Sequence, residues 1–209
     1  GMNNIDFAGE QPLTTYRKIS IASWKHPRDP QVYAAMDLPM EAAEKFLSEF
    51  PGEQKSTLTH YVSQILAHCF EKFPQFNHVL RNGQLHQREA VDVFITTLVK
   101  NAAGKDLSGF VIRDVTAIGM EEVAKQAAAG VAALRKGDDP QMARVQGMTR
   151  AMPTWLLLIV LRMQDFFQHT LNLDLSWAGI PRDPVGSVII TNIGALGLES
   201  AFIPLSPYT

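Results

Sequence analysis

VGSVIITNIGALGLESAFIP, residues Val185 to Pro204, is the most informative segment of the sequence. Its run from Ser187 to Ile190 is dominated by β-branched residues, which is typical of a buried strand. Thr191 and Asn192 follow directly, and glycines come soon after them. Polar side chains at a strand end, beside glycines that allow a sharp turn or a close approach, are placed to face a ligand. The alternative interpretation is an ordinary strand followed by a glycine-rich turn.

The composition excludes several classes of function. The chain has 209 residues, enough for one sizeable domain with a hydrophobic core. Its formal net charge of -2 gives no electrostatic signature of nucleic-acid binding. A single cysteine, Cys69, rules out an internal disulfide and a cysteine-based metal cluster, and it fits a reducing, cytoplasmic setting. The N-terminus shows no signal-peptide pattern, and no metal site is predicted.

Three segments have helical periodicity: Met40 to Phe50, Leu58 to Phe73 and Met120 to Lys136. The second gives the clearest signal, and Cys69 lies on its apolar stripe, so we predict that Cys69 fills the core. His60 and His68 share the other face of this helix. They are about 12 Å apart along the axis at the usual helical rise, too far to bind one metal ion. We interpret both as solvated or hydrogen-bonded histidines.

Other segments have the pattern of strands. Residues 32–38 alternate in polarity, which predicts a strand with one buried side. Asn82-Gly83 between apolar flanks is the strongest short signal for a hairpin. The runs Val91–Val99 and Phe110–Val115 are predicted as two further strands, with a turn at 101–105 between them.

The C-terminal stretch resembles the TISNLG…G…F.P segment in the catalytic domain of the 2-oxoacid dehydrogenase dihydrolipoamide acyltransferases, which share the fold of chloramphenicol acetyltransferase. Residues 73–77, FPQFN, resemble the FPelN that follows a helix in that family, and Arg17 belongs to a segment that resembles its R…IA motif. The resemblance runs from about Tyr16 to Pro207. It implies an α/β (α+β) fold, a two-layer sandwich with helices packed on a mixed sheet, and a homotrimer with active sites between subunits.

The resemblance also implies the chemistry. Acyl transfer needs a base for the acceptor's proton and a donor for the tetrahedral oxyanion. In the family the donor is a hydroxyl in the strand that this chain's TNIG resembles. By resemblance, Thr191 is the oxyanion stabiliser, Asn192 supports it, and Arg17 forms a supporting ion pair. The substrate would be coenzyme A or an acyl-CoA, with a small-molecule acceptor and no metal.

The catalytic base of the family has no counterpart in this sequence. That base is the histidine of HxxxDG, and none of the six histidines begins such a motif. His78 and the following Asn82-Gly83 only mimic it, and we interpret them as a turn. The sequence stops before the position of the motif, so the fold is expected to be C-terminally incomplete. Two readings stay open: an acyltransferase impaired in this chain, and a non-catalytic oligomeric scaffold or binding subunit.

We divide the chain into an N-terminal tail, residues 1–15, and an acyltransferase-like domain, residues 16–209. The domain contains an apolar helical insertion at about 141–184. Within it, Pro153 to Gln168 is predicted to be a buried or subunit-contacting helix, because its apolar run is far shorter than the ~20 residues that span a bilayer. A peripheral membrane helix is a third, weaker hypothesis, since the polar face lacks the usual basic residues.

Overall fold

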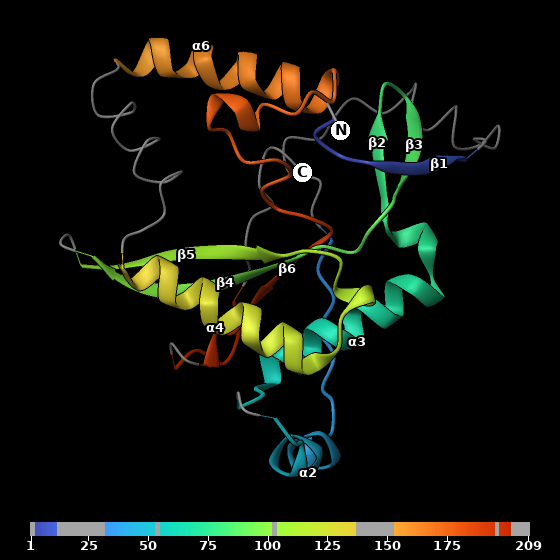
Figure 1. Ribbon diagram of the computed structural model, residues 1–209, viewed down its shortest axis with the longest axis vertical. Coiled ribbons are helices and arrows are strands. Elements are labelled where there is room, and N and C mark those ends of the chain that lie inside the picture. Colours follow the sequence, from blue (N-terminus) through green and yellow to red (C-terminus); the bar gives the residue numbers. More distant parts are fainter. Residues whose placement is uncertain are drawn as a thin grey trace.

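The structure is a computed structural model that describes residues 3–11, 32–52, 55–101, 104–136, 153–194 and 197–201. These ranges form a mixed α/β fold with two three-stranded sheets (Figure 1), which confirms the predicted fold class. The helices are α2 (Glu41–Glu49), α3 (Leu58–Lys72), α4 (Met120–Lys136) and α6 (Thr154–Asp165). The strands are β1 (Phe7–Gln11), β2 (His78–Arg81), β3 (Gln84–Arg88), β4 (Val93–Asn101), β5 (Gly104–Ile112) and β6 (Val188–Thr191).

The first sheet has the strand order β5-β4-β6 and is mixed. β4 pairs antiparallel with β5 from Val93 to Asn101, and it pairs parallel with β6 only as far as Thr96. The two strands predicted on either side of a turn at 101–105 are therefore confirmed as a hairpin. β5 begins earlier than predicted, at Gly104, because cross-strand pairing outweighs the weak strand propensity of its first residues.

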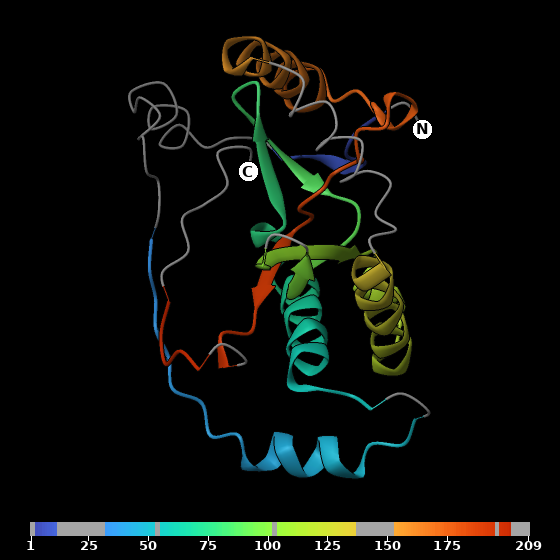
Figure 2. The ribbon, with the colours of Figure 1, turned by 90° about the vertical axis from the view of Figure 1, so that its left-hand side faces the viewer.

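Helices α3 and α4 lie side by side on one face of this sheet (Figure 2). The core between them consists of small and β-branched side chains: Ala67, Val91, Val93, Ile95, Ile112, Val115, Val123 and Ala127. Both helices match the predicted segments to within a residue or two at each end. The apolar periodicity of each segment is thus explained by burial against the sheet.

The apolar stripe of α3 is wider than the face that the sheet covers. Ser63 and Ala67 are buried, whereas Leu58 and Ile65 are each 43% exposed. Cys69 is also exposed, so the prediction that Cys69 fills the core is wrong. The physical reason is rotation: small residues bring the helix close to the sheet and turn the larger apolar ones sideways.

The second sheet has the order β1-β3-β2. The predicted hairpin is present, with Asn82 and Gly83 both at positive φ (51° and 76°), as a primed two-residue turn requires. β1 pairs antiparallel with β3 and was not predicted. It lies within residues 1–15, the segment that was expected to be a tail.

Helix α6 lies on the same side as this hairpin, away from α3 and α4 (Figure 1). A π-helix, Phe166–Thr170, continues α6, and the Arg81 guanidinium donates to the Thr170 carbonyl oxygen at 3.1 and 2.9 Å. The predicted helix at 153–168 is confirmed, but Met163 and Phe166 are 54% and 50% exposed. Within the described ranges, no helix has the length and apolar character needed to cross a bilayer.

Residues 32–38 do not form the strand that their alternation predicted. The segment has no regular structure, and Val32 and Met36 are 94% and 81% exposed. A strand needs a partner for its backbone N–H and C=O groups, and no strand pairing involves this segment among the described residues. The strand prediction is therefore wrong.

Candidate functional site

Thr191 is the last residue of β6, and it lies opposite Thr96 of β4 in the parallel register. The two hydroxyl oxygens are 3.1 Å apart and hydrogen-bonded. Each hydroxyl has one hydrogen to donate, and the hydroxyl can rotate to suit its partners. In the structure Thr191 donates to Thr96. Rotation of both hydroxyls reverses the bond, so that Thr96 donates to Thr191 and the Thr191 hydrogen is left for a ligand. The pair therefore holds a donor at the end of the strand.

The Thr191 hydroxyl leaves the sheet on the face opposite α3 and α4. Val188 and Ile190 pack against the core, and side chains alternate along a strand, so Ile189 and Thr191 point to the other side. Ile189 is 42% exposed and Leu98, on the same face of β4, is 38% exposed. Thr191 itself is half-buried. The hydroxyl is therefore not sealed inside the core.

Two further residues, Asn192 and Arg17, were predicted to support Thr191. Asn192 is exposed, and its side-chain oxygen accepts a hydrogen bond from the Gly194 N–H at 3.1 Å, which closes a local turn after β6. The structure therefore places Asn192 next to Thr191, but its oxygen is engaged with the backbone. Arg17 lies outside the described residues, and its role stays a prediction.

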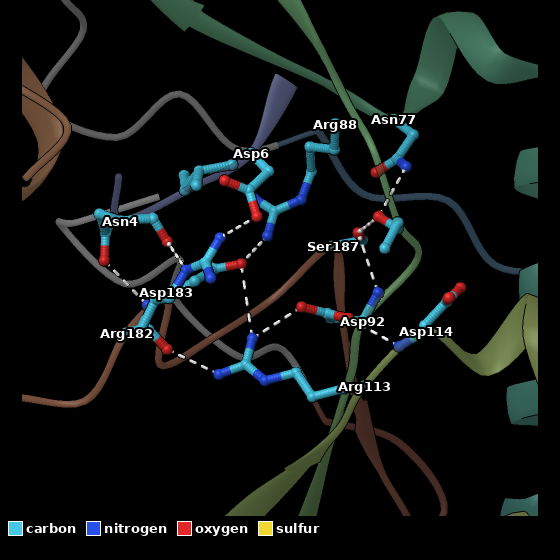
Figure 3. Close-up of polar contacts among 12 residues, drawn as sticks. Asn4, Asp6, Asn77, Arg88, Asp92, Arg113, Asp114, Arg182, Asp183 and Ser187 are labelled. Carbon is cyan, nitrogen blue, oxygen red and sulfur yellow. Dashed lines mark hydrogen bonds and ion pairs between the residues drawn. The ribbon is translucent and has the colours of Figure 1, made fainter. Parts of the chain in front are cut away.

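A network of aspartates and arginines fixes the start of β6 (Figure 3). Asp92 accepts from the Arg113 guanidinium at 2.7 Å and from the Asp114 N–H at 2.8 Å. Asp183 pairs with the buried Arg88, and Arg113 lies 3.7 Å from the same Asp183 carboxylate. Burial lowers the pKa of Arg88, but a guanidinium stays charged at any physiological pH. These pairs join β3, β4 and β5 to the segment that leads into β6.

Gly186 sets the register of β6 at the same point. It has a φ of +72°, and a Cβ there would lie 2.7 Å from the Asp92 carbonyl oxygen. The next residue, Ser187, donates its N–H to that oxygen at 2.8 Å. Only glycine fits this close approach, so the Asp92–Gly186 contact fixes where β6 begins and thereby places Thr191 opposite Thr96.

A cavity of about 730 Å³ lies on the helix side of the same sheet. β6 ends beside Thr96, whereas β4 continues to Asn101. The part of β4 beyond Thr96 therefore has no β6 residue paired with it, and the cavity lies there. The cavity is lined by residues before and at the start of α3 (Lys55, Thr57, Thr59, His60), by strands β4, β5 and β6 (Ile95, Thr96, Thr97, Leu98, Phe110, Thr191, Asn192) and by α4 (Ala124, Ala127, Ala128, Val131, Ala132, Arg135). Its size falls within the ~300–1,000 Å³ of small-molecule sites.

His60 lines this cavity, which the sequence did not indicate. The Thr57 N–H donates to His60 Nδ1 at 3.2 Å, so His60 belongs to the cap of α3. Burial lowers the pKa of His60, which favours the neutral ring. With Nδ1 accepting, the neutral ring carries its hydrogen on Nε2, so in this state Nε2 is a donor rather than a base.

Sequence reasoning missed the polar network and the Thr96–Thr191 pair. One signal was available: charged residues flank several apolar strands, as Asp92, Arg113 and Asp183 do. Asn77, the end of the FPQFN motif, is buried and donates its side-chain amide to the Ala90 carbonyl at 3.1 Å. Within the described residues, no group of three or more His, Cys, Asp or Glu side chains could hold a metal ion.

Comparison with known proteins gives structural matches only. No family model and no curated protein matches the chain. Among solved structures, the dihydrolipoamide acetyltransferase of Azotobacter vinelandii is 24% identical, with a TM-score of 0.36. The cubic core of a pyruvate dehydrogenase multienzyme complex is 23% identical, also with a TM-score of 0.36. Each of these matches covers 47% of this chain and 37% of the other.

A third match is a truncated catalytic core of the 2-oxoacid dehydrogenase multienzyme complex from Thermoplasma acidophilum, at 19% identity and a TM-score of 0.33. It covers 40% of this chain and 38% of that one. All three structures are thus catalytic cores of 2-oxoacid dehydrogenase complexes, of which this chain spans less than two fifths. TM-scores in this range are too low to establish a shared fold.

Proposed function

We propose that this protein is an acyltransferase-family protein related to the dihydrolipoamide acyltransferase catalytic domain, which moves an acyl group between coenzyme A and a thiol or hydroxyl acceptor. One observation carries the proposal: in the stretch that resembles the family, the Thr191 hydroxyl lies at a strand end, on an open face of the sheet, hydrogen-bonded to a second hydroxyl. A donor held in this way is what a developing oxyanion requires.

The chemistry assigned to Thr191 is electrostatic. An acceptor thiol or hydroxyl loses its proton to water and attacks the thioester carbonyl, whose oxygen becomes negative. The tetrahedral intermediate then collapses, the C–S bond to coenzyme A breaks, and the coenzyme A thiolate leaves. Thr191 Oγ1–H would donate to that negative oxygen while Thr96 donates to Thr191. The register of β4 and β6 fixes both oxygens, so only the two hydroxyl hydrogens have to rotate before Thr191 donates to the oxyanion.

The proposal includes impaired catalysis in this chain. A general base contributes ~10²–10⁴-fold to rates of this kind, and the sequence lacks the family's histidine motif. His60 lines a cavity on the helix side, and its Nδ1 lone pair is engaged by the Thr57 N–H. This favours a second candidate function, a non-catalytic scaffold or binding subunit with the same fold.

The test compares Thr191→Val with Thr170→Val, a matched change at an exposed threonine that ends the π-helix. Acetyl-CoA and coenzyme A at millimolar concentration are expected to raise the melting temperature of the wild type. Any acyl transfer from acetyl-CoA to dihydrolipoamide should fall ~10²–10³-fold in Thr191→Val, the usual loss for one oxyanion donor, and stay unchanged in Thr170→Val. Ligand binding without transfer would favour the scaffold, and neither binding nor transfer would end the acyltransferase proposal.

We also propose that the protein acts in the cytoplasm as a homotrimer. Apolar side chains on the outward face of the β5-β4-β6 sheet support self-association, since Leu98 and Ile189 remain 38% and 42% exposed in a single chain. Light scattering coupled to size-exclusion chromatography should give three times the mass of the chain. A monomer at micromolar concentration would contradict this part of the proposal.

A further inference from the structure

We propose that the cavity between α3, α4 and the sheet binds an amphipathic anion, namely an aliphatic chain that ends in a carboxylate. This inference does not rest on the acyltransferase proposal. Thr191 and Asn192 are among the lining residues, but the side chains that select this ligand lie before α3, at the start of α3, in β4 and in α4.

The apolar part of the cavity is built to leave space. On the sheet side it is lined by Ile95 and Phe110. On the helix side α4 contributes mainly alanines and Val131, whose short side chains leave space between the helix and the sheet. Gly130 allows α4 to approach Phe110 closely, because a Cβ at that position would lie 2.6 Å from the phenyl ring. The result is an apolar wall that suits a hydrocarbon chain.

The charge of the cavity selects the head group. Lys55 and Arg135 line it, and among the described residues that line it none is acidic. Burial keeps His60 neutral, so the positive charge comes from these two side chains. Thr57, Thr59 and Thr97 add hydroxyls that can donate to an anion. Both cations are exposed, so a cationic head would be repelled by them and an anionic head would gain a charge-assisted contact that a neutral head lacks.

The size of the cavity bears on the chain length. At about 730 Å³ it lies in the upper part of the ~300–1,000 Å³ range of small-molecule sites. A short acid such as butyrate would bury little apolar surface, and burial contributes ~0.8 kcal/mol for each methylene group. We therefore expect a medium-length chain to bind, with the carboxylate at Arg135 or Lys55 and the hydrocarbon along α4.

The first experiment measures binding of decanoate by isothermal titration calorimetry below its micelle concentration. Decanol, butyrate and decyltrimethylammonium test the charge and the chain separately. Decanoate should bind at least tenfold more tightly than each of the other three. Equal binding of decanol would overturn the assignment of an anionic head, and no binding of decanoate would overturn the proposal.

Variants then locate the ligand. Ala128→Leu adds a large side chain at a position that lines the cavity, whereas Ala133→Leu makes the same change at an equally exposed position of α4 that does not line it. Ala128→Leu should weaken decanoate binding at least tenfold, and Ala133→Leu should leave it unchanged. Combining Lys55→Gln with Arg135→Gln should weaken binding tenfold or more, because a charge-assisted hydrogen bond is lost.

Circular dichroism shows whether each variant is folded, and unchanged binding in folded Ala128→Leu would overturn the proposed location. Coenzyme A is titrated into the same variants, so that loss of decanoate binding and loss of coenzyme A binding are measured separately.

Discussion

His60 shows how one side chain can make the stability of α3 depend on pH. The Thr57 N–H donates to His60 Nδ1, and a protonated Nδ1 cannot accept that bond. Burial lowers the pKa of His60 below its ordinary value of 6.5, so the unfolded chain takes up a proton more readily than the folded chain. The contribution of His60 to stability is therefore fully present above about pH 6.5 and is lost as the pH falls through the folded-state pKa.

We predict that the melting temperature of the wild type falls more steeply below about pH 6.5 than that of His60→Gln. Glutamine is a common third residue of a capping box, so it keeps the cap without titrating. His68→Gln is the matched control, because His68 is exposed on the same helix, and it should follow the wild type. Calorimetry gives the melting temperature at each pH. If the melting temperatures of His60→Gln and the wild type fall in parallel, another group is responsible for the pH dependence.

The residues of the candidate site could be predicted only in part. Thr191 and Asn192 were found because a β-branched run ending in polar residues is a local pattern. The Thr96 partner, the Asp92–Arg113 pair and the location of His60 in a cavity wall could not be found in this way. Each depends on which strands pair and in which register, and Thr96 and Thr191 are 95 positions apart in the chain.

Among the secondary-structure elements, the contact of α4 with β5 predicts that replacing a helical glycine by alanine lowers the stability of the protein, the opposite of the usual effect. Replacing a helical glycine by alanine normally stabilises a helix by roughly 1 kcal/mol. At Gly130, however, the new Cβ would lie 2.6 Å from the Phe110 ring, and overpacking costs ~1–3 kcal/mol. We expect Gly130→Ala to lower the free energy of unfolding by about 1 kcal/mol in urea titrations.

The double variant Gly130→Ala with Phe110→Leu is the control for this prediction. A smaller side chain at 110 makes room for the new methyl group, so the double variant should be more stable than the sum of the two single changes implies. A gain in stability for Gly130→Ala alone would mean that α4 does not approach Phe110 as closely as described.

The same scale explains which elements the sequence predicts well. The α3 and α4 segments and the Asn82-Gly83 hairpin were predicted because periodicity and turn chemistry are local. Residues 32–38 have the alternation of a strand but take part in no strand pairing among the described residues. Cys69 has the periodicity of a core residue but is exposed. Periodicity identifies a possible buried face, and only the neighbouring elements determine how much of it is buried.

At the scale of the whole molecule, the polar network is what couples the two sheets. Arg88 ends β3 in one sheet, Asp92 and Arg113 flank the strands of the other, and Asp183 lies in the segment that leads to β6 (Figure 3). Arg182 extends the network to the N-terminal segment by pairing with Asp6 and donating to the Asn4 carbonyl at 3.0 Å. Segments from both ends of the chain therefore meet at one cluster of charges.

We predict that Arg88→Met is strongly destabilising, by ~3–5 kcal/mol. Among the described residues, it leaves the largely buried Asp183 carboxylate with the more distant Arg113, at 3.7 Å, as its one cationic partner. Arg88 is 9% exposed, so solvent cannot replace the lost guanidinium. Adding Asp183→Asn removes the uncompensated charge and should restore part of the loss, as urea midpoints can show. Lys125→Met breaks the exposed Lys125–Glu122 pair and should change stability by less than about 1 kcal/mol. An equally small effect at Arg88 would mean that hydrophobic packing alone holds the sheets together.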